Sequence, residues 1–331
     1  MITLITLCFI FILGVLLLPS TASILRLLVF IPISVINLFL IPVVVPKYNY
    51  YGVLSRLTAV STLIGLPAIV LGPFGPIHAY HHSKPPGFPI PLYGLMSIFD
   101  NPNAMGAIAV FGALAAMWEY FFDRSILSLL LFIINSSGVY FSQSRAAILA
   151  LIAGVTVVGI YCIAGQETLH ITTYLGLVSA PTIVLIKFGI IPGPELIQSI
   201  DFNNRVELWT AAYHAFLDRP LIGWGIGNVP DAMRPYLAPS FLKGMGPHTS
   251  YIRMFAATGI IGGVLYLYIH LRSISCIVPN IKDNSDATEY ALVIAGMVIH
   301  TFSGISIFGL AITSVVPAII LGYAQLYPDE K

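Results

Sequence analysis

Residues 104–122 read AMGAIAVFGALAAMWEYFF, and the single charged residue of this stretch is Glu119. An apolar run of about 20 residues is long enough to cross the hydrocarbon core of a bilayer as a helix. Similar runs recur on both sides, separated by Pro, Gly and charged residues. The sequence therefore predicts an all-α, polytopic transmembrane helix bundle of about ten spans, within a range of roughly nine to twelve. The predicted spans are 2–18, 24–45, 57–75, 104–122, 125–141, 146–165, 171–190, 250–271, 290–307 and 309–327.

The composition agrees with this interpretation. Of 331 residues, 57% are hydrophobic and 9% are charged, and the mean hydropathy is +0.91. A soluble domain of this size does not need so apolar a chain, so we expect a single integral membrane domain over residues 1–331. The formal net charge of +1 gives no sign of a nucleic-acid partner. The first apolar run lacks a basic start and a small-residue cleavage pattern, so we expect a retained span and not a signal peptide.

Two long polar stretches, residues 76–103 and 192–249, interrupt the spans. Lysine and arginine in short loops favour the cytoplasmic side of a membrane. We therefore predict a multi-pass protein of the plasma or inner membrane with both termini in the cytoplasm and both long loops outside. The residues placed inside are Lys47, Arg56, Arg124, Arg272, Lys282 and Lys331, against Arg26, Lys84 and Arg145 outside.

Arg145 follows Ser142-Gln143-Ser144 in a very short connection between two predicted spans. An arginine at a span end can be an anchor that reaches into the interface. The three small polar residues before it make a poor lipid-facing surface and favour a polar pocket. Both interpretations of Arg145 remain open on the residues alone.

The second long loop contains NNRVELWTAAYHAFL at residues 203–217, which has the spacing of a short amphipathic helix. Asn203 or Asn204 can cap its start. Arg205 then stands in the first turn beside free backbone N–H groups, where an anion would be favoured. An ordinary interfacial helix with Arg205 in solvent is the alternative. The residues expected on its packed face are Leu208, Trp209, Ala212, Tyr213 and Phe216.

Two further segments follow in the same loop. Residues 220–228, PLIGWGIGN, carry glycines that allow tight turns and close approach to a ligand. No GK[ST] follows, so this is not a nucleotide loop; a structural turn is the default and substrate contact the second interpretation. His248 precedes the span that starts at residue 250. Histidine can take a proton near neutral pH, although a lone histidine there can also be an incidental polar cap.

Arg145, Arg205 and His248 come from three segments that are predicted to face the same side. Two arginines can hold a diphosphate without a metal ion, and a histidine can deprotonate an attacking hydroxyl. This combination describes glycosyl transfer from a lipid-linked diphosphate sugar at the outer leaflet. The rival is a secondary transporter or lipid-glycan flippase, which would place ionisable groups near the bilayer midplane. His300 is the plausible midplane group in this sequence, and a purely structural scaffold is a third interpretation.

No metal site is predicted. His78, His81 and His82 cluster in the first long loop, but no carboxylate or cysteine has ligand spacing beside them. The three cysteines show no metal-binding spacing either. Asp100, Asn101 and Asn103 are expected to form a turn that caps the next span, with substrate binding as the alternative.

Four segments resemble the O-antigen ligase and polymerase superfamily of membrane glycosyltransferases. They are FDNPNAMG at 99–106, SQSRAAILAL at 142–151, NNRVELWTAAYHAFLDRPLIGWGIGN at 203–228 and HTSYIRMFAATGIIG at 248–262. The resemblance covers roughly residues 98–270. It departs from the family at Thr249, because many members have Asn after the histidine.

The resemblance implies an inverting, metal-independent transfer that needs no cofactor. Its donor would be a polyprenyl-diphosphate-linked glycan and its acceptor a glycan or lipid-glycan hydroxyl, so the product would be a surface polysaccharide. Polymerase and ligase are not separated by the sequence. The implied catalytic residues are Arg145 and Arg205, which grip the diphosphate, and His248, which acts as general base or positions the acceptor. The implied substrate-binding residues are Arg145, Arg205, Trp209, Gly223, Gly225 and Asn103.

Overall fold

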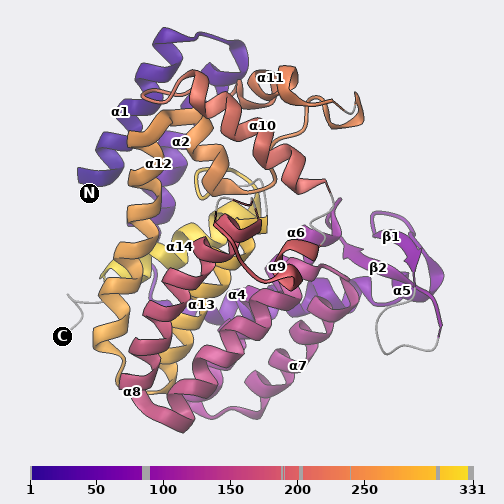
Figure 1. Ribbon diagram of the computed structural model, residues 1–331. Coiled ribbons are helices and arrows are strands. Elements are labelled where there is room, and N and C mark those ends of the chain that lie inside the picture. Colours follow the sequence, from indigo (N-terminus) through magenta and orange to yellow (C-terminus); the bar gives the residue numbers. More distant parts are fainter. Residues whose placement is uncertain are drawn as a thin grey trace. The chain divides into compact units, whose positions relative to one another are not determined.

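A computed structural model describes residues 2–83, 90–187, 189, 191–200, 204–238, 240–302 and 306–326. Over these residues the chain is mostly helical, as the apolar runs predict (Figure 1). It divides into two compact units, named here unit 1 (Met1–Val29 with Ile160–Ile269) and unit 2 (Phe30–Gly159 with His270–Lys331). The unit boundaries fall inside three helices: α2 (Thr21–Val35), α8 (Arg145–Lys187) and α12 (Ser250–Ile277).

Helix α6 (Pro102–Asp123) is the core of unit 2. It packs against α4 (Lys47–Gly65), α7 (Ile126–Phe141) and α13 (Asn284–Phe302). Glycine makes this packing close: a Cβ on Gly112 would lie 2.7 Å from the Cβ of Thr58 on α4 and 3.0 Å from Cγ of Asn135 on α7. The remaining elements of unit 2 include a π-helix (Ile36–Leu40), α3 (Ile41–Val44), α5 (Ala68–Leu71), a 3-10 helix (Val278–Asn280) and α14 (Ile312–Leu326).

The charged residues of α4 pair with buried carboxylates of neighbouring helices. Arg56 Nη1 lies 2.8 Å from Glu119 Oε1 on α6, and Lys47 Nζ lies 3.3 Å from Glu289 Oε2 on α13. Ser55 Oγ also donates to Glu119 Oε2 at 2.6 Å. These pairs let α4 begin at Lys47, whereas the sequence predicts a span only from residue 57.

The first long loop contains a small antiparallel sheet, so the all-α prediction is wrong in this segment. Strand β1 (His78–Ser83) pairs with β2 (Leu92–Ser97), in a register that joins His78 to Ser97 and Ser83 to Leu92. Leu92 and Leu95 of β2 are buried, and β2 packs against α5 and the start of α6. Burial of these apolar side chains stabilises strands that are not evident from the Pro- and Gly-rich sequence.

Unit 1 begins with α1 (Ile2–Leu17) and the start of α2, and it holds the second long loop. That loop is folded into short helices, as the sequence predicts for its middle part. They are α9 (Glu195–Ser199), α10 (Arg205–Asp218), α11 (Val229–Met233) and two 3-10 turns (Arg234–Tyr236 and Ser240–Leu242).

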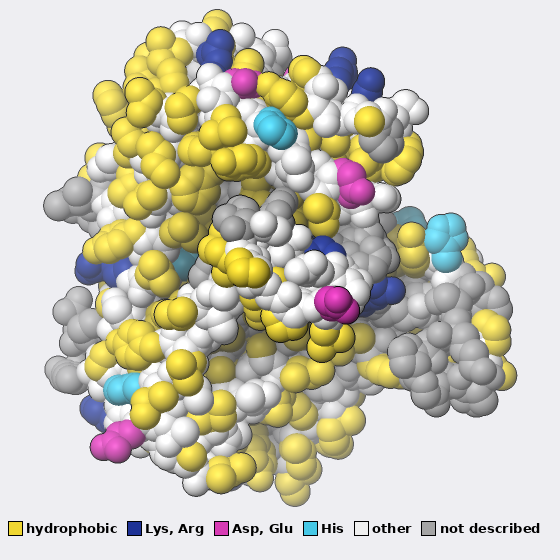
Figure 2. Space-filling view, viewed as in Figure 1, with side chains coloured by type: hydrophobic (Ala, Val, Ile, Leu, Met, Phe, Trp, Pro, Cys, Tyr) yellow, Lys and Arg dark blue, Asp and Glu magenta, His cyan; other side chains and the backbone are white. Residues whose placement is uncertain are grey.

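Five helical segments of the described chain are long and apolar enough to cross a membrane: Thr21–Val44, Lys47–Leu71, Pro102–Asp123, Arg145–Lys187 and Ser250–Asn280. Three shorter apolar helices accompany them: Thr3–Leu17, Ile126–Phe141 and Ile312–Leu326. On the face shown in Figure 2, hydrophobic side chains are widespread and charged ones are few and scattered. The count of about ten spans stays a prediction.

Helix α8 is one element of 43 residues that covers two predicted spans. Its backbone is not helical throughout, because Gly165 has φ 76° and ψ −176°. The break falls at the predicted end of the span 146–165.

Candidate functional site

Arg205 is the first residue of α10, as the sequence predicts. The residue before it, Asn204, has a left-handed backbone with φ 55° but makes no side-chain capping bond, so the capping prediction is wrong for Asn204. Asn203 lies outside the described residues. The packed face of α10 is formed by Leu208, Trp209, Ala211, Ala212 and Ala215. Tyr213, which was expected on this face, is 55% exposed, because the turn of the helix directs it away from unit 1.

His248 stands two residues before α12 in unit 1, and its side chain is exposed. Its backbone is left-handed, with φ 48°. The pKa of His248 is lowered from its ordinary value of 6.5, first by partial desolvation and then by the positive charges of Arg205 and Arg253. A lowered pKa keeps the imidazole neutral at neutral pH, so the ring can accept a proton. Arg205 and His248 are thus brought together, as predicted.

Arg253 and Arg26 belong to the same region of unit 1, and the sequence reasoning missed both as site residues. Arg253 lies in the first turn of α12, where its backbone N–H donates to the carbonyl of Thr249 at 3.2 Å. Arg26 of α2 interacts electrostatically with Arg253. Its Nη1 also donates to the carbonyl of Ile226 at 2.7 Å. The available signal was the spacing, since Arg253 follows His248 by a little over one helical turn.

Within unit 1, the charges of Arg205 and Arg253 thus act on His248, and the charge of Arg26 acts on Arg253; these four residues are called the basic cluster. Positive groups held close together repel one another, and a bound anion reduces this repulsion. A guanidinium can bind a phosphate through two parallel hydrogen bonds. This cluster is thus suited to a phosphate-bearing ligand beside a neutral histidine.

The glycine-rich segment 220–228 packs against a break in α12 and forms hydrogen bonds with it. Gly259 interrupts that helix with φ 68° and ψ −168°. The carbonyls freed there accept backbone N–H groups from the segment: Trp224 N donates to Ala256 O at 2.9 Å and Gly225 N to Ala257 O at 2.8 Å. In return, Ile260 N donates to Pro220 O at 2.7 Å. The segment and the break therefore satisfy each other's backbone groups, as buried backbone requires.

Gly223 and Gly225 have left-handed backbones, with φ 66° and 82°. At Gly223, an added Cβ would lie 2.5 Å from the backbone nitrogen of Thr258 in α12. This geometry supports the structural-turn interpretation of the two glycines. Their predicted contact with substrate stays a prediction, as does that of Trp209, whose side chain is 4% exposed.

The other end of the segment is held by the turn between α1 and α2. The Oδ1 of Asn228 accepts a hydrogen bond from Ser20 Oγ at 2.8 Å. Its Nδ2 donates to Trp224 O at 3.0 Å. The Trp224 ring in turn donates from Nε1 to Ala215 O of α10 at 2.6 Å, and the Arg219 guanidinium lies 4.4 Å from the ring centroid. These bonds connect the segment to α10, the helix that begins with Arg205.

Arg145 and Asn103 are brought together in unit 2. Arg145 is the exposed first residue of α8. The residue before it, Ser144, donates from Oγ to Oδ1 of Asn103 at 2.8 Å. The side chain of Asn101 accepts from Asn103 N at 2.8 Å and caps α6, so the predicted capping turn is confirmed.

The predicted catalytic residues are thus divided: Arg205 and His248 lie in unit 1, and Arg145 lies in unit 2. Each is associated with unusual backbone geometry. Five described non-glycine residues have positive φ, and three of them are Gln143, Asn204 and His248. A left-handed backbone is uncommon outside glycine and often marks functional sites. Here it occurs at, or within two residues of, each predicted catalytic residue.

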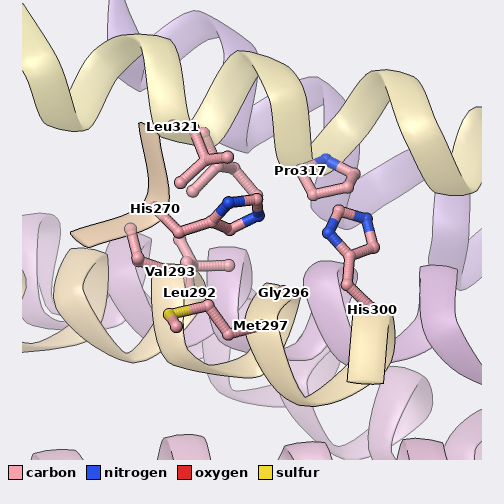
Figure 3. Close-up of a pocket in the computed structure, with 9 residues that line it drawn as sticks. His270, Leu292, Val293, Gly296, Met297, His300, Pro317 and Leu321 are labelled. Atoms are coloured by element: carbon pink, nitrogen blue, oxygen red, sulfur yellow. The ribbon is translucent and has the colours of Figure 1, made fainter. Parts of the chain in front are cut away.

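Two other groups of histidines lie in unit 2. His78 and His81 belong to β1, and among the described residues no group of three or more His, Cys, Asp or Glu side chains could hold a metal ion. His270 and His300, both buried, line a pocket together with Met297, Pro317 and other apolar residues (Figure 3). Their ring centroids are 5.8 Å apart in an edge-to-face arrangement. Such a pair fits packing between α12, α13 and α14.

The chain compares with known proteins as follows. No curated protein matches the chain. A chain from a solved structure, described as structural coordination of polymerization and crosslinking by a peptidoglycan synthase complex, is similar at 14% identity and a TM-score of 0.47. The similarity covers 98% of this chain and 97% of that one. The O-antigen ligase family matches residues 128–267, a range that includes Arg145, Arg205 and His248. This match supports the resemblance to the O-antigen ligase family over residues 128–267 of the chain.

Proposed function

We propose that this protein is a membrane glycosyltransferase that moves a glycan from a polyprenyl-diphosphate carrier to an acceptor hydroxyl at the outer leaflet. The O-antigen ligase domain and the five long apolar helices support the general part of this proposal, a glycan-transferring membrane enzyme. The single observation that carries the finer part is the grouping of His248 with Arg205 and Arg253 in unit 1, where partial desolvation first, and then these two positive charges, lower the pKa of the histidine.

In the proposed reaction, the acceptor oxygen attacks the anomeric carbon of the donor sugar and forms a new C–O bond. The bond between that carbon and the diphosphate oxygen breaks, and the electron pair leaves with the polyprenyl diphosphate. His248 takes the proton of the acceptor hydroxyl. Attack from the face opposite the leaving group inverts the anomeric centre.

Arg205 and Arg145 stabilise the charge that develops on the leaving diphosphate. Guanidinium groups suit this role because they stay charged and can bind phosphate oxygens in pairs. They can therefore perform it without a metal ion. Arg253 and Arg26 add positive charge on the side of Arg205. The acceptor, and thus the choice between polymerase and ligase, is not specified by these residues.

The test is glycan transfer by the purified protein in detergent, with a polyprenyl-diphosphate oligosaccharide donor, with and without EDTA. We expect Arg145→Ala, Arg205→Ala and His248→Ala each to lose at least about a hundredfold in rate, because each removes charge stabilisation or the base. The matched controls are His214→Ala and Arg234→Ala in the same long loop. His214 stacks on Tyr236 with ring centroids 5.3 Å apart, and Arg234 pairs with Asp231 at the surface.

Retained transfer in all three variants would overturn the site assignment. Loss of transfer in EDTA would overturn the metal-independent mechanism. Absence of transfer with every donor, together with movement of the donor across liposomes, would favour the flippase alternative.

A further inference from the structure

A hydrogen-bond chain runs from the start of α6 to the start of α8 in unit 2. Asn101 Oδ1 accepts from Asn103 N at 2.8 Å, which fixes the backbone of Asn103. The Oδ1 of Asn103 then accepts from Ser144 Oγ at 2.8 Å. The same hydroxyl oxygen accepts the backbone N–H of Ala147 at 3.4 Å, in the first turn of α8. The orientation of that turn therefore depends on Asn103.

The turn that precedes Arg145 has little freedom. Ser142 Oγ donates to Val139 O at 2.7 Å and accepts from Ser144 N at 3.3 Å. Gln143 holds a left-handed backbone with φ 56°, and its Nε2 donates to Leu92 O of β2 at 3.4 Å. Arg145 thus begins α8 directly after a turn that is fixed on both sides.

Close packing fixes the same turn against α6. An added Cβ on Gly106 of α6 would lie 2.5 Å from Ser142 Oγ and 3.0 Å from Ser144 Cβ. Ser142 and Ser144 are buried, with 1% and 4% exposure. A buried hydroxyl that loses its acceptor is costly, so Ser144 would turn away and take the start of α8 with it.

We infer that Asn103 acts in the transfer reaction as a positioning residue, through Ser144, by fixing the start of α8 from which Arg145 reaches the donor diphosphate. This inference rests on the proposed function and replaces the expected direct contact of Asn103 with the substrate. The Oδ1 atom accepts the hydroxyl of Ser144, and Ser144 directly precedes the exposed Arg145.

A double-mutant cycle distinguishes positioning from direct contact, because it measures whether two side chains act together. Asn103→Ala and Ser144→Ala remove the two ends of one hydrogen bond. We expect each to lower kcat for transfer on the order of tenfold, and the double variant to lose no more than either single one. The KM for the acceptor should stay unchanged, because Arg145 is assigned to the donor.

Rates are measured per folded molecule, with the monodisperse fraction of each variant and its melting temperature as checks. Ser137→Ala is the matched control, because its hydroxyl donates to Ile134 O of its own helix at 2.7 Å. Losses that multiply in the double variant, or a rise in acceptor KM with unchanged donor kinetics, would overturn the positioning role. A wild-type rate in Asn103→Ala would do the same while leaving the proposed function intact. A wild-type rate in Arg145→Ala would instead overturn the proposed function, and the inference with it.

Discussion

Substitution of Gly223 by alanine tests the contact between the glycine-rich segment and the break in α12. With φ at 66°, an alanine would be strained by about 1–2 kcal/mol. Its Cβ would also lie 2.5 Å from Thr258 N and 2.6 Å from Ala257 O. Overpacking against backbone typically costs a further 1–3 kcal/mol or so. The two terms together predict a destabilisation of roughly 2–5 kcal/mol.

The assay is thermal unfolding of the purified protein in detergent, followed by near-UV circular dichroism. At about 2–4 °C per kcal/mol, we expect Tm to fall by roughly 4–20 °C. Gly244→Ala is the matched control, because Gly244 has φ 94° but no described atom within 4 Å of an added Cβ. That variant should lose only the strain of about 1–2 kcal/mol. Equal losses in the two variants would refute the argument that the segment is packed against α12.

Two further predictions follow from charge. Arg253→Gln removes one of the positive charges that lower the pKa of His248, so that pKa should rise toward 6.5. Because the neutral imidazole is the base, the acid limb of the plot of kcat/KM against pH should then move to higher pH. An unmoved limb, measured from about pH 5 to 8, would contradict this role. Arg56→Met deprives the buried Glu119 of its ion pair with the half-exposed Arg56 and should cost about 1–3 kcal/mol in unfolding experiments, against about 0–1 kcal/mol for Arg234→Met in an exposed pair. A cost for Arg56→Met no larger than that control would show that Glu119 does not depend on the pair.

Helix positions could be predicted from the sequence where one continuous apolar run decides them. The run 104–122 became α6 at Pro102–Asp123, and 125–141 became α7 at Ile126–Phe141. Such a run predicts a helix without knowledge of the tertiary structure, because the number of consecutive apolar residues gives the length of the helix. The prediction was least accurate for α4. Hydropathy started the predicted span at residue 57, and so left Lys47 and Arg56 outside a helix that begins at Lys47. Carboxylates from distant helices pair with those two charges, and hydropathy does not contain that information.

The sequence names residues for the candidate site, and their roles stay a prediction, but it does not give the geometry of the site. Motifs identified Arg205 and His248, and the structure places them together in unit 1. Arg253 was missed because an arginine near the start of a span resembles an ordinary interfacial anchor. The break at Gly259 was also missed, because it lies inside an uninterrupted apolar run. It is stabilised by hydrogen bonds from Trp224 and Gly225, which are remote in sequence.

The break at Gly165 has a consequence for how the chain is threaded through the membrane. A straight helix of 43 residues would be about 65 Å long, roughly twice the thickness of the hydrocarbon core. Interrupted at Gly165, the same residues provide two pieces that are each about one bilayer long. Two crossings in succession return the chain to the side from which it entered. If both pieces cross, the long loop with Arg205 and His248 faces the same compartment as Arg145. The proposed reaction needs this even number of crossings, and the break at Gly165 is what permits it.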